Sequence, residues 1–217
     1  MPDAPTTALR GVTLELAGLC KGYGPQAVLR GVDLTVGAGE LLAIVGQSGT
    51  GKSVLLRQIA GLEPPDAGRI VVGGIELSRY LALPPARKPF RIAMVFQNAA
   101  LLASLSVGEN VALRLREHGG HTALEIARVT QRVLEAVDLR GTEQALPATL
   151  SGGMRKRVAI ARALAADPDL ILYDEPTADL DPLLTEQIGR LIAGIRTTRG
   201  ATQIIVTHNL PLARPSA

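Results

Sequence analysis

The sequence predicts an α/β fold in which a helical region interrupts a sheet-forming core. Short apolar runs of strand character dominate the first 96 residues, and several are continuous, as in strands buried on both faces. Helical patterns fill about 98–165, after which strands alternate with a helix. The expected strands are 12–16, 33–36, 40–45, 68–72, 91–96, 170–173 and 203–207. The expected helices follow Lys52 and cover about 106–116, 122–137, 154–166 and 185–199.

Composition sets limits on the class of protein. The 217 residues suit one domain with an inserted lobe, and a hydrophobic content of 47% is enough for a real core. The net charge of +3 is a small excess without a basic stripe between aromatic platforms, so no nucleic-acid partner is expected. The run Arg155-Lys156-Arg157 is interpreted as a solvated helix face.

Two further features concern the cellular setting. Cys20 is the only cysteine, so no intrachain disulfide forms, which fits a reducing compartment. The polar segment 1–7 is unlike a signal peptide and is expected to be flexible. The apolar runs are shorter than the ~20 residues that span a bilayer, so work at a membrane would require docking onto another protein.

Residues 46–53 form a phosphate-binding loop between an expected strand and an expected helix. They read Gly-Gln-Ser-Gly-Thr-Gly-Lys-Ser, which fits Gly, four residues, Gly-Lys-Ser. Glycines let the backbone N–H groups approach phosphate oxygens, and the helix that follows directs its positive end toward them. Lys52 adds a compact positive charge, and Ser53 offers a hydroxyl to Mg²⁺. A chance glycine-rich turn is the alternative, and the Lys-Ser pair argues against it.

Polar residues follow three of the expected strands at their carboxyl ends, where such sheets bind ligands. Asp174 and Glu175 end an apolar strand; the first suits Mg²⁺ through water, and the second suits activation of a water molecule. Alone, these acids would be interpreted as a charged strand end facing solvent. Gln97 ends another strand, where its amide suits Mg²⁺ or the orientation of a water molecule; a plain polar cap is the alternative. His208 follows a third strand, where it suits contact with a γ-phosphate; a structural histidine is the alternative.

A second helix start narrows the family. Ser151 and two glycines in Leu150-Ser151-Gly152-Gly153-Met154 precede a basic helix and Ala-Arg-Ala-Leu, which gives a second anion site or an ordinary Ser cap. With the loop at 46–53, Gln97, Asp174-Glu175, Leu180-Asp181 and His208 in order, the chain resembles ABC-type ATPases over about residues 10–210. The resemblance implies a P-loop NTPase (RecA-like) α/β core with an antiparallel β edge and an inserted helical subdomain.

The resemblance also implies a domain plan and roles. One ABC ATPase domain would span 8–217, with the RecA-like core at about 10–97 and 166–217 and the helical subdomain, carrying the signature, at about 98–165. Catalysis would fall to Glu175 as base, His208 as switch residue and Gln97 as the sensor that links nucleotide to a membrane partner. The Mg²⁺ ligands would be Ser53, Gln97 and Asp174. Nucleotide-binding residues would be Tyr23, stacked on adenine, and Gly46, Gln47, Ser48, Gly49, Thr50, Gly51, Lys52, Ser53 and Val54.

The implied mechanism uses two copies of the chain. Ser151, Gly152, Gly153 and Met154 would contact the γ-phosphate of ATP held by the second subunit, and Asp181 would cross the dimer interface. Two ATP molecules would join the copies head to tail, and hydrolysis would reopen them. An integral membrane permease would use that motion for transport, which places the chain in the cytoplasm, on the inner face of the cell membrane.

Short segments resemble one branch, the ATPase subunits of Mla-type phospholipid transporters. They are Met154, the run 94–101, and 115–118 following 109–111. Alternatively, Arg116-Glu117-His118 is only an exposed helix end. Phospholipid transport, together with a substrate-binding lipid carrier, is therefore expected. The sequence departs from the family after His208, where 209–217 would replace a helix and closing strands, so a shortened C-terminus is expected. That would put the contact with a regulatory subunit in doubt.

Other functions compete with lipid transport. The same ATPase could serve an importer or exporter of another substrate, such as an amino acid, a metal chelate or a lipoprotein. A soluble ABC ATPase acting on DNA or ribosomes usually has tandem cassettes or long coiled-coil insertions, and this chain has neither. A truncated module that binds ATP without hydrolysing it is disfavoured by Glu175 and favoured by the short tail.

Overall fold

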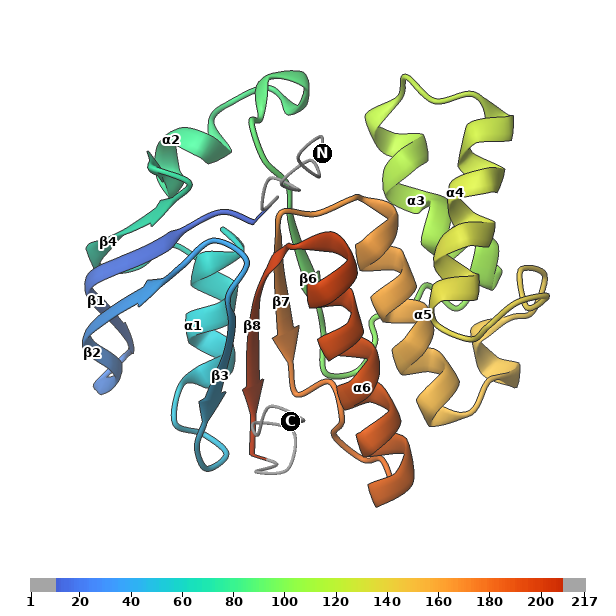
Figure 1. The fold of residues 1–217 in the computed structure, drawn as a ribbon. Helices are drawn as coiled ribbons and strands as arrows, with labels where there is room; N and C mark the ends of the chain where they lie inside the picture. Colours follow the sequence, from blue (N-terminus) through green and yellow to red (C-terminus); the bar gives the residue numbers. More distant parts are fainter. Residues whose placement is uncertain (1–10, 209–217) are drawn as a thin grey trace, which may run out of the picture.

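The computed structural model describes residues 11–208, which form two four-stranded sheets and the helices around them (Figure 1). One sheet is antiparallel and the other parallel, and the four α-helices that follow residue 106 lie on the face of the parallel sheet opposite helix α1 (Lys52–Ile59). The predicted α/β class, with an antiparallel edge and an inserted helical region, is confirmed. The expected flexible segment 1–7 and the expected shortened end after His208 lie outside the described residues.

The antiparallel sheet has the order β2-β1-β4-β5, with β1 at Leu14–Tyr23, β2 at Gln26–Val36, β4 at Ala67–Val72 and β5 at Ile75–Glu76. β1 and β2 are longer than predicted. Their pairing shifts register between Leu16 and Leu19, next to Gly18 with its φ of 59°. Such a bulge breaks the alternation of apolar and polar residues that reveals a strand.

The parallel sheet has the order β3-β8-β7-β6. Its strands are β3 Leu41–Val45, β8 Thr202–Thr207, β7 Leu170–Asp174 and β6 Ile92–Val95. Every residue of β7 and β8 is buried, as expected for central strands covered on both faces. Because all four strands run the same way, the residues that follow them meet at one edge of the sheet.

Helix α1, Lys52–Ile59, packs between the two sheets, and its apolar side chains share a core with residues of β1, β4, β7 and β8. A second core fills the opposite face of the parallel sheet. There the buried side chains of α3 (Val107–His118), α4 (Ala123–Ala136), α5 (Gly152–Ala165) and α6 (Pro182–Arg199) meet those of β6 and β7. The parallel sheet is therefore covered on both faces, by one core on each side.

Local signals explain most helix starts. Ser106 and Thr122 form capping boxes with Glu109 and Glu125 at α3 and α4. α6 begins at Pro182, three residues before the predicted start, because Asp181 caps it and proline suits the first turn. The five-residue helix α2 (Leu77–Leu81) and the 3₁₀ turns at Pro85–Arg87 and Pro147–Thr149 were not expected.

The interpretation of Arg155-Lys156-Arg157 as a solvated face is wrong for Lys156 and Arg157, whereas Arg155 is exposed. Lys156 is 7% exposed and donates a hydrogen bond to the backbone oxygen of Gln97. Arg157 donates to the backbone oxygen of Val137 and to Asp138. The side chains face the loops that surround α5, because a helix packed on several sides leaves little surface for solvent.

Among residues 11–208, no helix is long and apolar enough to cross a bilayer.

Candidate functional site

The predicted phosphate-binding loop connects β3 to α1. Gly49 and Gly51 have φ values of 81° and 93°, in the left-handed region that favours glycine. A side chain at Gly51 would also collide with β2, since an added Cβ would lie 2.8 Å from Val28 Cγ1. The loop is therefore held against the antiparallel sheet in a conformation that only glycine adopts at low cost, at the start of a helix whose first N–H groups suit an anion.

Lys52 lies across this loop. Its Nζ donates to the backbone oxygens of Gly46, at 2.7 Å, and Gln47, at 2.8 Å, and lies 3.7 Å from Glu175 Oε1. Thr50 closes the turn with a hydrogen bond of 2.9 Å to the oxygen of Gln47. The ammonium is thus placed between the loop and the acid at the end of β7.

The loop and the two predicted acids meet directly. Ser53 Oγ donates to Asp174 Oδ1 at 2.7 Å, although the two residues are 121 positions apart. The strand order explains this contact: only β8 separates β3 from β7, and α1 packs on β7 and β8. Asp174 and Glu175 are each 7% exposed, so two carboxylates are held in a nearly dry setting beside a lysine.

Glu175 has a strained and well-anchored position. Its φ is 45°, uncommon for a residue with a side chain, and its N–H donates to the oxygen of Val206 at 2.9 Å. His208 contacts the same carboxylate twice: its backbone N–H lies 3.1 Å and its Nδ1 2.9 Å from Glu175 Oε2. The structure therefore brings Lys52, Glu175 and His208 together, with His208 touching the acid.

Gln97 follows β6, the strand that pairs with β7. Its side chain is exposed, and its backbone oxygen accepts the hydrogen bond from Lys156. Burial lowers the pKa of Lys156, and the nearby carboxylates of Asp179, Asp174 and Glu175 oppose that effect. Lys156 is the residue at this site that sequence reasoning missed, because three adjacent basic residues give no sign of which one is buried.

Tyr23 ends β1 and is 44% exposed. Its hydroxyl donates a hydrogen bond to Glu63, in the loop that follows α1, and that bond is the main reason the pKa of Glu63 is lowered. Lys21 lies 5.8 Å from the centre of the Tyr23 ring. The structure gives Tyr23 no hydrogen bond to residues 46–54, so its stacking on adenine stays a prediction.

The predicted signature begins α5. Ser151 Oγ accepts the N–H of Met154 at 3.2 Å, and Asp181 Oδ1 accepts the N–H of Leu184 at 2.9 Å at the start of α6. The two helix starts lie side by side, since a Cβ on Gly153 would lie 3.2 Å from Leu184. Within residues 11–208, no hydrogen bond or ion pair joins residues 151–154 to residues 46–54 of the same chain.

The oxygen atoms at the site suit a magnesium ion as ligands. Mg²⁺ prefers hard oxygen ligands and is usually held by one or two protein side chains together with water and phosphate oxygens. The Ser53 hydroxyl and the Asp174 carboxylate supply two such oxygens beside a phosphate-binding loop. Ser53 and Asp174 are two of the three predicted ligands; the third, Gln97, is exposed just after β6, and its role as a ligand stays a prediction.

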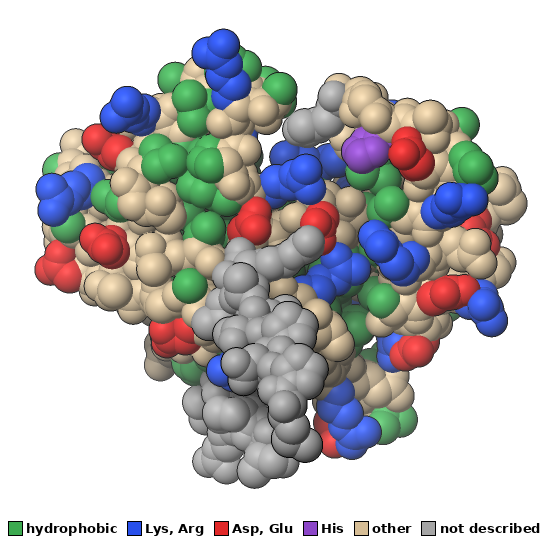
Figure 2. Space-filling view, turned by 45° about the horizontal axis from the view of Figure 1, so that its top comes forward, with side chains coloured by type: hydrophobic (Ala, Val, Ile, Leu, Met, Phe, Trp, Pro, Cys, Tyr) green, Lys and Arg blue, Asp and Glu red, His purple; other side chains and the backbone are tan. Residues whose placement is uncertain are grey.

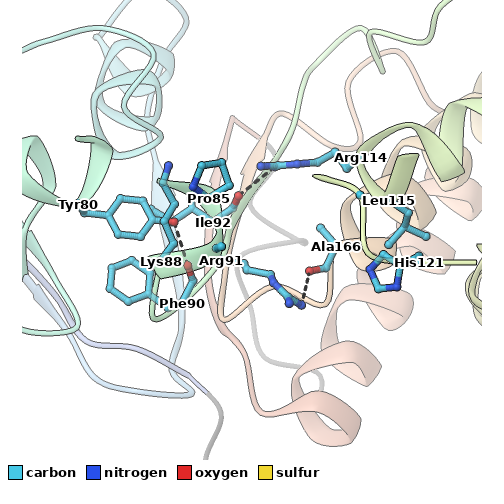
Figure 3. A pocket seen from close by; sticks show the side chains of 12 residues that line it. Tyr80, Pro85, Lys88, Phe90, Arg91, Ile92, Arg114, Leu115, His121 and Ala166 are labelled. Carbon is cyan, nitrogen blue, oxygen red and sulfur yellow. Dashed lines mark hydrogen bonds between the residues drawn. The ribbon is translucent and has the colours of Figure 1, made fainter. Parts of the chain in front are cut away.

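A separate pocket of about 310 Å³ lies between the antiparallel-sheet side of the molecule and the helical region. Lys88, Arg91, Arg114 and His121 line it, over the buried rings of Tyr80 and Phe90 (Figure 3). The two rings stack with centroids 4.4 Å apart, and Lys88 Nζ lies 4.7 Å from the centre of the Tyr80 ring. Lys and Arg side chains also gather in the hollow between the two halves of the surface in Figure 2.

Comparison with known proteins agrees with this geometry. The family model for the ABC transporter matches residues 29–178, more than half of the chain. A probable ribonucleotide transport ATP-binding protein, mkl of Mycobacterium tuberculosis, is 40% identical over 94% of this chain and 57% of its own length. The methionine import ATP-binding protein MetN of Mesorhizobium japonicum is 41% identical over all of this chain and 58% of its own. The chain thus spans less than two thirds of these curated relatives.

Solved structures give the same result. The ATP-binding cassette MJ0796, in a dimeric post-hydrolysis state bound to ADP and Pi, superposes with a TM-score of 0.81 at 32% identity, covering 92% of this chain and 90% of that one. The cbiO1 protein of Clostridium perfringens, part of the complex cbiONQ, gives a TM-score of 0.79 at 28% identity, covering 92% of this chain and 79% of its own. The chain therefore belongs to the ABC transporter family and carries its ATPase domain.

Proposed function

We propose that this chain binds ATP with Mg²⁺, hydrolyses it, and so drives an ABC transporter for a small polar solute. The observation that supports hydrolysis most strongly is the meeting of Lys52 and Ser53 with Glu175 and Asp174 at one edge of the parallel sheet. A loop that only bound phosphate would not need the Glu175 carboxylate 3.7 Å from its lysine. The dimeric MJ0796 structure with ADP and Pi supports the same chemistry in a relative.

Each residue has a role that its position supports. The N–H groups of the loop and Lys52 bind the β- and γ-phosphates. Ser53 and Asp174 would hold Mg²⁺, which would supply positive charge beside the transferred phosphoryl group. Glu175 orients the attacking water and accepts its proton. His208, through its contacts of 2.9 and 3.1 Å, keeps the Glu175 carboxylate in place. Gln97 contributes from the adjacent strand end.

A second copy completes the site in this proposal. Residues 151–154 have no bond to the loop of their own chain, while their helix start with its N–H groups suits a phosphate. We infer that they face ATP bound to the partner copy, with Asp181 beside them at the interface. The dimeric state of the solved MJ0796 cassette supports this arrangement.

The test is ATP turnover by the purified chain with Mg²⁺. Lys52→Ala removes the charge that grips phosphate, and Glu175→Gln removes the base while keeping its size. A general base contributes about 10²–10⁴-fold, so kcat of Glu175→Gln should fall by that factor. Glu186→Gln, an exposed acid on α6 that pairs with Arg190, is the matched control and should leave kcat unchanged. Equal turnover by the wild type and Glu175→Gln would refute hydrolysis at this site.

We further propose that the pocket between the two halves receives an acidic segment of an integral membrane permease, which places the chain on the inner face of the membrane. Charge complementarity supports this occupant, because four basic side chains line the pocket. Arg91 and Arg114 are anchored by bonds of 3.2 and 3.3 Å to the oxygens of Ala166 and Ile92, so their guanidinium groups are held in place.

The docking test uses co-expression with an integral membrane permease of an ABC transporter. His121→Glu with Lys88→Glu should abolish co-sedimentation with membranes while ATP turnover of the free chain is retained. Arg128→Glu, an exposed arginine of α4 outside the pocket, should co-sediment like the wild type. Normal sedimentation of the charge-reversed variant would exclude this pocket as the docking site.

The transported solute is proposed from the relatives. The names of two relatives at 40–41% identity refer to ribonucleotide transport and methionine import, which favours import of an amino acid or another small polar solute over phospholipid. The phospholipid hypothesis rests on Met154 and on short segments, 94–101 and 115–118 following 109–111. Proteoliposomes with the permease distinguish the two: ATP-dependent uptake of labelled methionine or ribonucleotide supports the proposal, whereas ATP-dependent loss of labelled phospholipid from the vesicles would replace it.

A further inference from the structure

The segment that follows β6 has an unfavourable backbone conformation. Ala99 and Ala100 have φ values of 63° and 45°, two consecutive residues with side chains in the left-handed region. Only glycine adopts this region without a steric penalty, so such a pair persists only where surrounding contacts enforce it. Gln97 lies two residues before the strained pair, and its position therefore depends on whatever holds this segment.

Two basic residues of α5 hold it. Lys156 Nζ donates to the backbone oxygen of Gln97. Arg162 donates through Nη1 to the oxygen of Ala100 at 2.6 Å and through Nη2 to the oxygen of Ala99 at 2.8 Å. Three of the four carbonyl groups in residues 97–100 thus accept hydrogen bonds from charged donors on one helix. Hydrogen bonds from ionised donors are stronger than neutral ones.

The two donors are shielded from solvent to different degrees: Lys156 is buried and Arg162 is half-buried. Lys156 is 7% exposed, and burial lowers the pKa of both Lys156 and Arg162 below their ordinary values. A desolvated cation is costly unless it is well paired, so leaving it unpaired would be worse than keeping the contact. The negative side chains that act on Lys156 are those of Asp179, Asp174 and Glu175, the last two being the acids of the candidate site.

We propose that Lys156 and Arg162 are positioning residues, a two-point clamp by which α5 holds the strained segment 97–100 and so fixes the position of Gln97 after β6, the strand that pairs with β7. This inference rests on the proposed ATPase function. The clamp also links the N-terminus of α5 to Gln97, because Ser151 caps the helix that carries Lys156 and Arg162. A displacement of α5 caused by a phosphate at its N-terminus would be passed to Gln97 through these charged hydrogen bonds.

The experiment compares two variants. Lys156→Met keeps a long side chain but removes the hydrogen-bond donor, whereas Lys156→Arg keeps a charged donor. Misplacement of a catalytic group by about 1 Å costs up to about 10²-fold, so kcat of Lys156→Met should fall by about tenfold or more with the KM for MgATP within about twofold. Lys156→Arg should recover most of that loss. Arg128→Met, a basic residue on the surface of α4, is the matched control and should keep full turnover.

Two further measurements separate positioning from general destabilisation. In a Gln97→Ala background, Lys156→Met should cost less than about twofold in kcat, because the clamp acts through Gln97. Hydrogen–deuterium exchange of residues 97–105 should speed up in Lys156→Met while exchange in β7 stays as in the wild type. Unchanged exchange at 97–105 would overturn the clamp whether or not the chain hydrolyses ATP, and an equal kcat loss with and without Gln97 would overturn its catalytic role.

An inactive wild type would refute the proposed function alone. In that case the exchange measurement still decides the clamp. Arg162→Lys offers an independent variant, since one ammonium cannot donate in the fork geometry that reaches both Ala99 and Ala100. Local acceleration of exchange in that variant is expected, and exchange at the wild-type rate would contradict the second point of the clamp.

Discussion

Replacing Tyr173 by phenylalanine is expected to stabilise the protein. Tyr173 is 0% exposed in the middle of the parallel sheet, and its hydroxyl has no hydrogen-bond partner among the described residues. In the unfolded chain the same hydroxyl is hydrated, so folding removes its water without replacement. That loss costs about 1–3 kcal/mol, and the burial that causes it also raises the pKa of the phenol. Tyr173→Phe avoids this cost, with only a small void left by the oxygen.

The assay is thermal unfolding of both proteins at one pH. For a chain of this size, 1 kcal/mol corresponds to about 2–4 °C, so Tm should rise by about 2–12 °C. Tyr80→Phe is the matched control: Tyr80 is also buried, at 5% exposed, but its hydroxyl donates to the oxygen of Phe90 at 2.9 Å. Losing that bond should lower Tm by about 2–4 °C. Shifts of the same sign in both variants would refute the reasoning.

Three other changes have defined outcomes. Hydrogen bonds from Thr122 lower the folded pKa of Glu125, so its contribution to stability is present above pH about 4.3 and is lost on acidification; Glu125→Gln should unfold with a weaker pH dependence in acid-titrated melts. Gly51→Ala forces a φ of 93° and a 2.8 Å approach to Val28, and should reduce both Tm and ATP affinity measured by calorimetry. Ser53→Ala should raise the Mg²⁺ concentration for half-maximal turnover, and an unchanged titration would contradict the assigned ligand.

The helices could be predicted largely because their signals are local. Ser106 and Glu109, or Thr122 and Glu125, stand three residues apart and satisfy each other's N-terminal N–H groups wherever the chain goes. The ends of the strands were harder to predict from the sequence. β1 and β2 extend far beyond the predicted segments because the bulge near Gly18 shifts the inward face by one residue, and only pairing with the neighbouring strand reveals it.

The candidate site divides in the same way. Lys52, Ser53, Asp174, Glu175 and His208 could be selected from sequence because phosphate and Mg²⁺ chemistry needs those residue types at strand ends. The contacts between these residues could not be predicted from the sequence. That His208 touches Glu175, and that Ser53 reaches Asp174 across 121 positions, follows from the strand order β3-β8-β7, which no local pattern encodes.

The sequence by itself determined the chemistry of this protein: a glycine loop with Lys52, paired acids after an apolar strand, and a serine-capped basic helix. The tertiary structure alone decided which basic residues bond to distant backbone groups, since Lys156 and Arg162 donate to carbonyl groups 59 to 63 residues away in the chain. The physical reason is that burial and hydrogen-bond partnership are properties of packing between elements, whereas capping, loop conformation and donor type are properties of neighbouring residues.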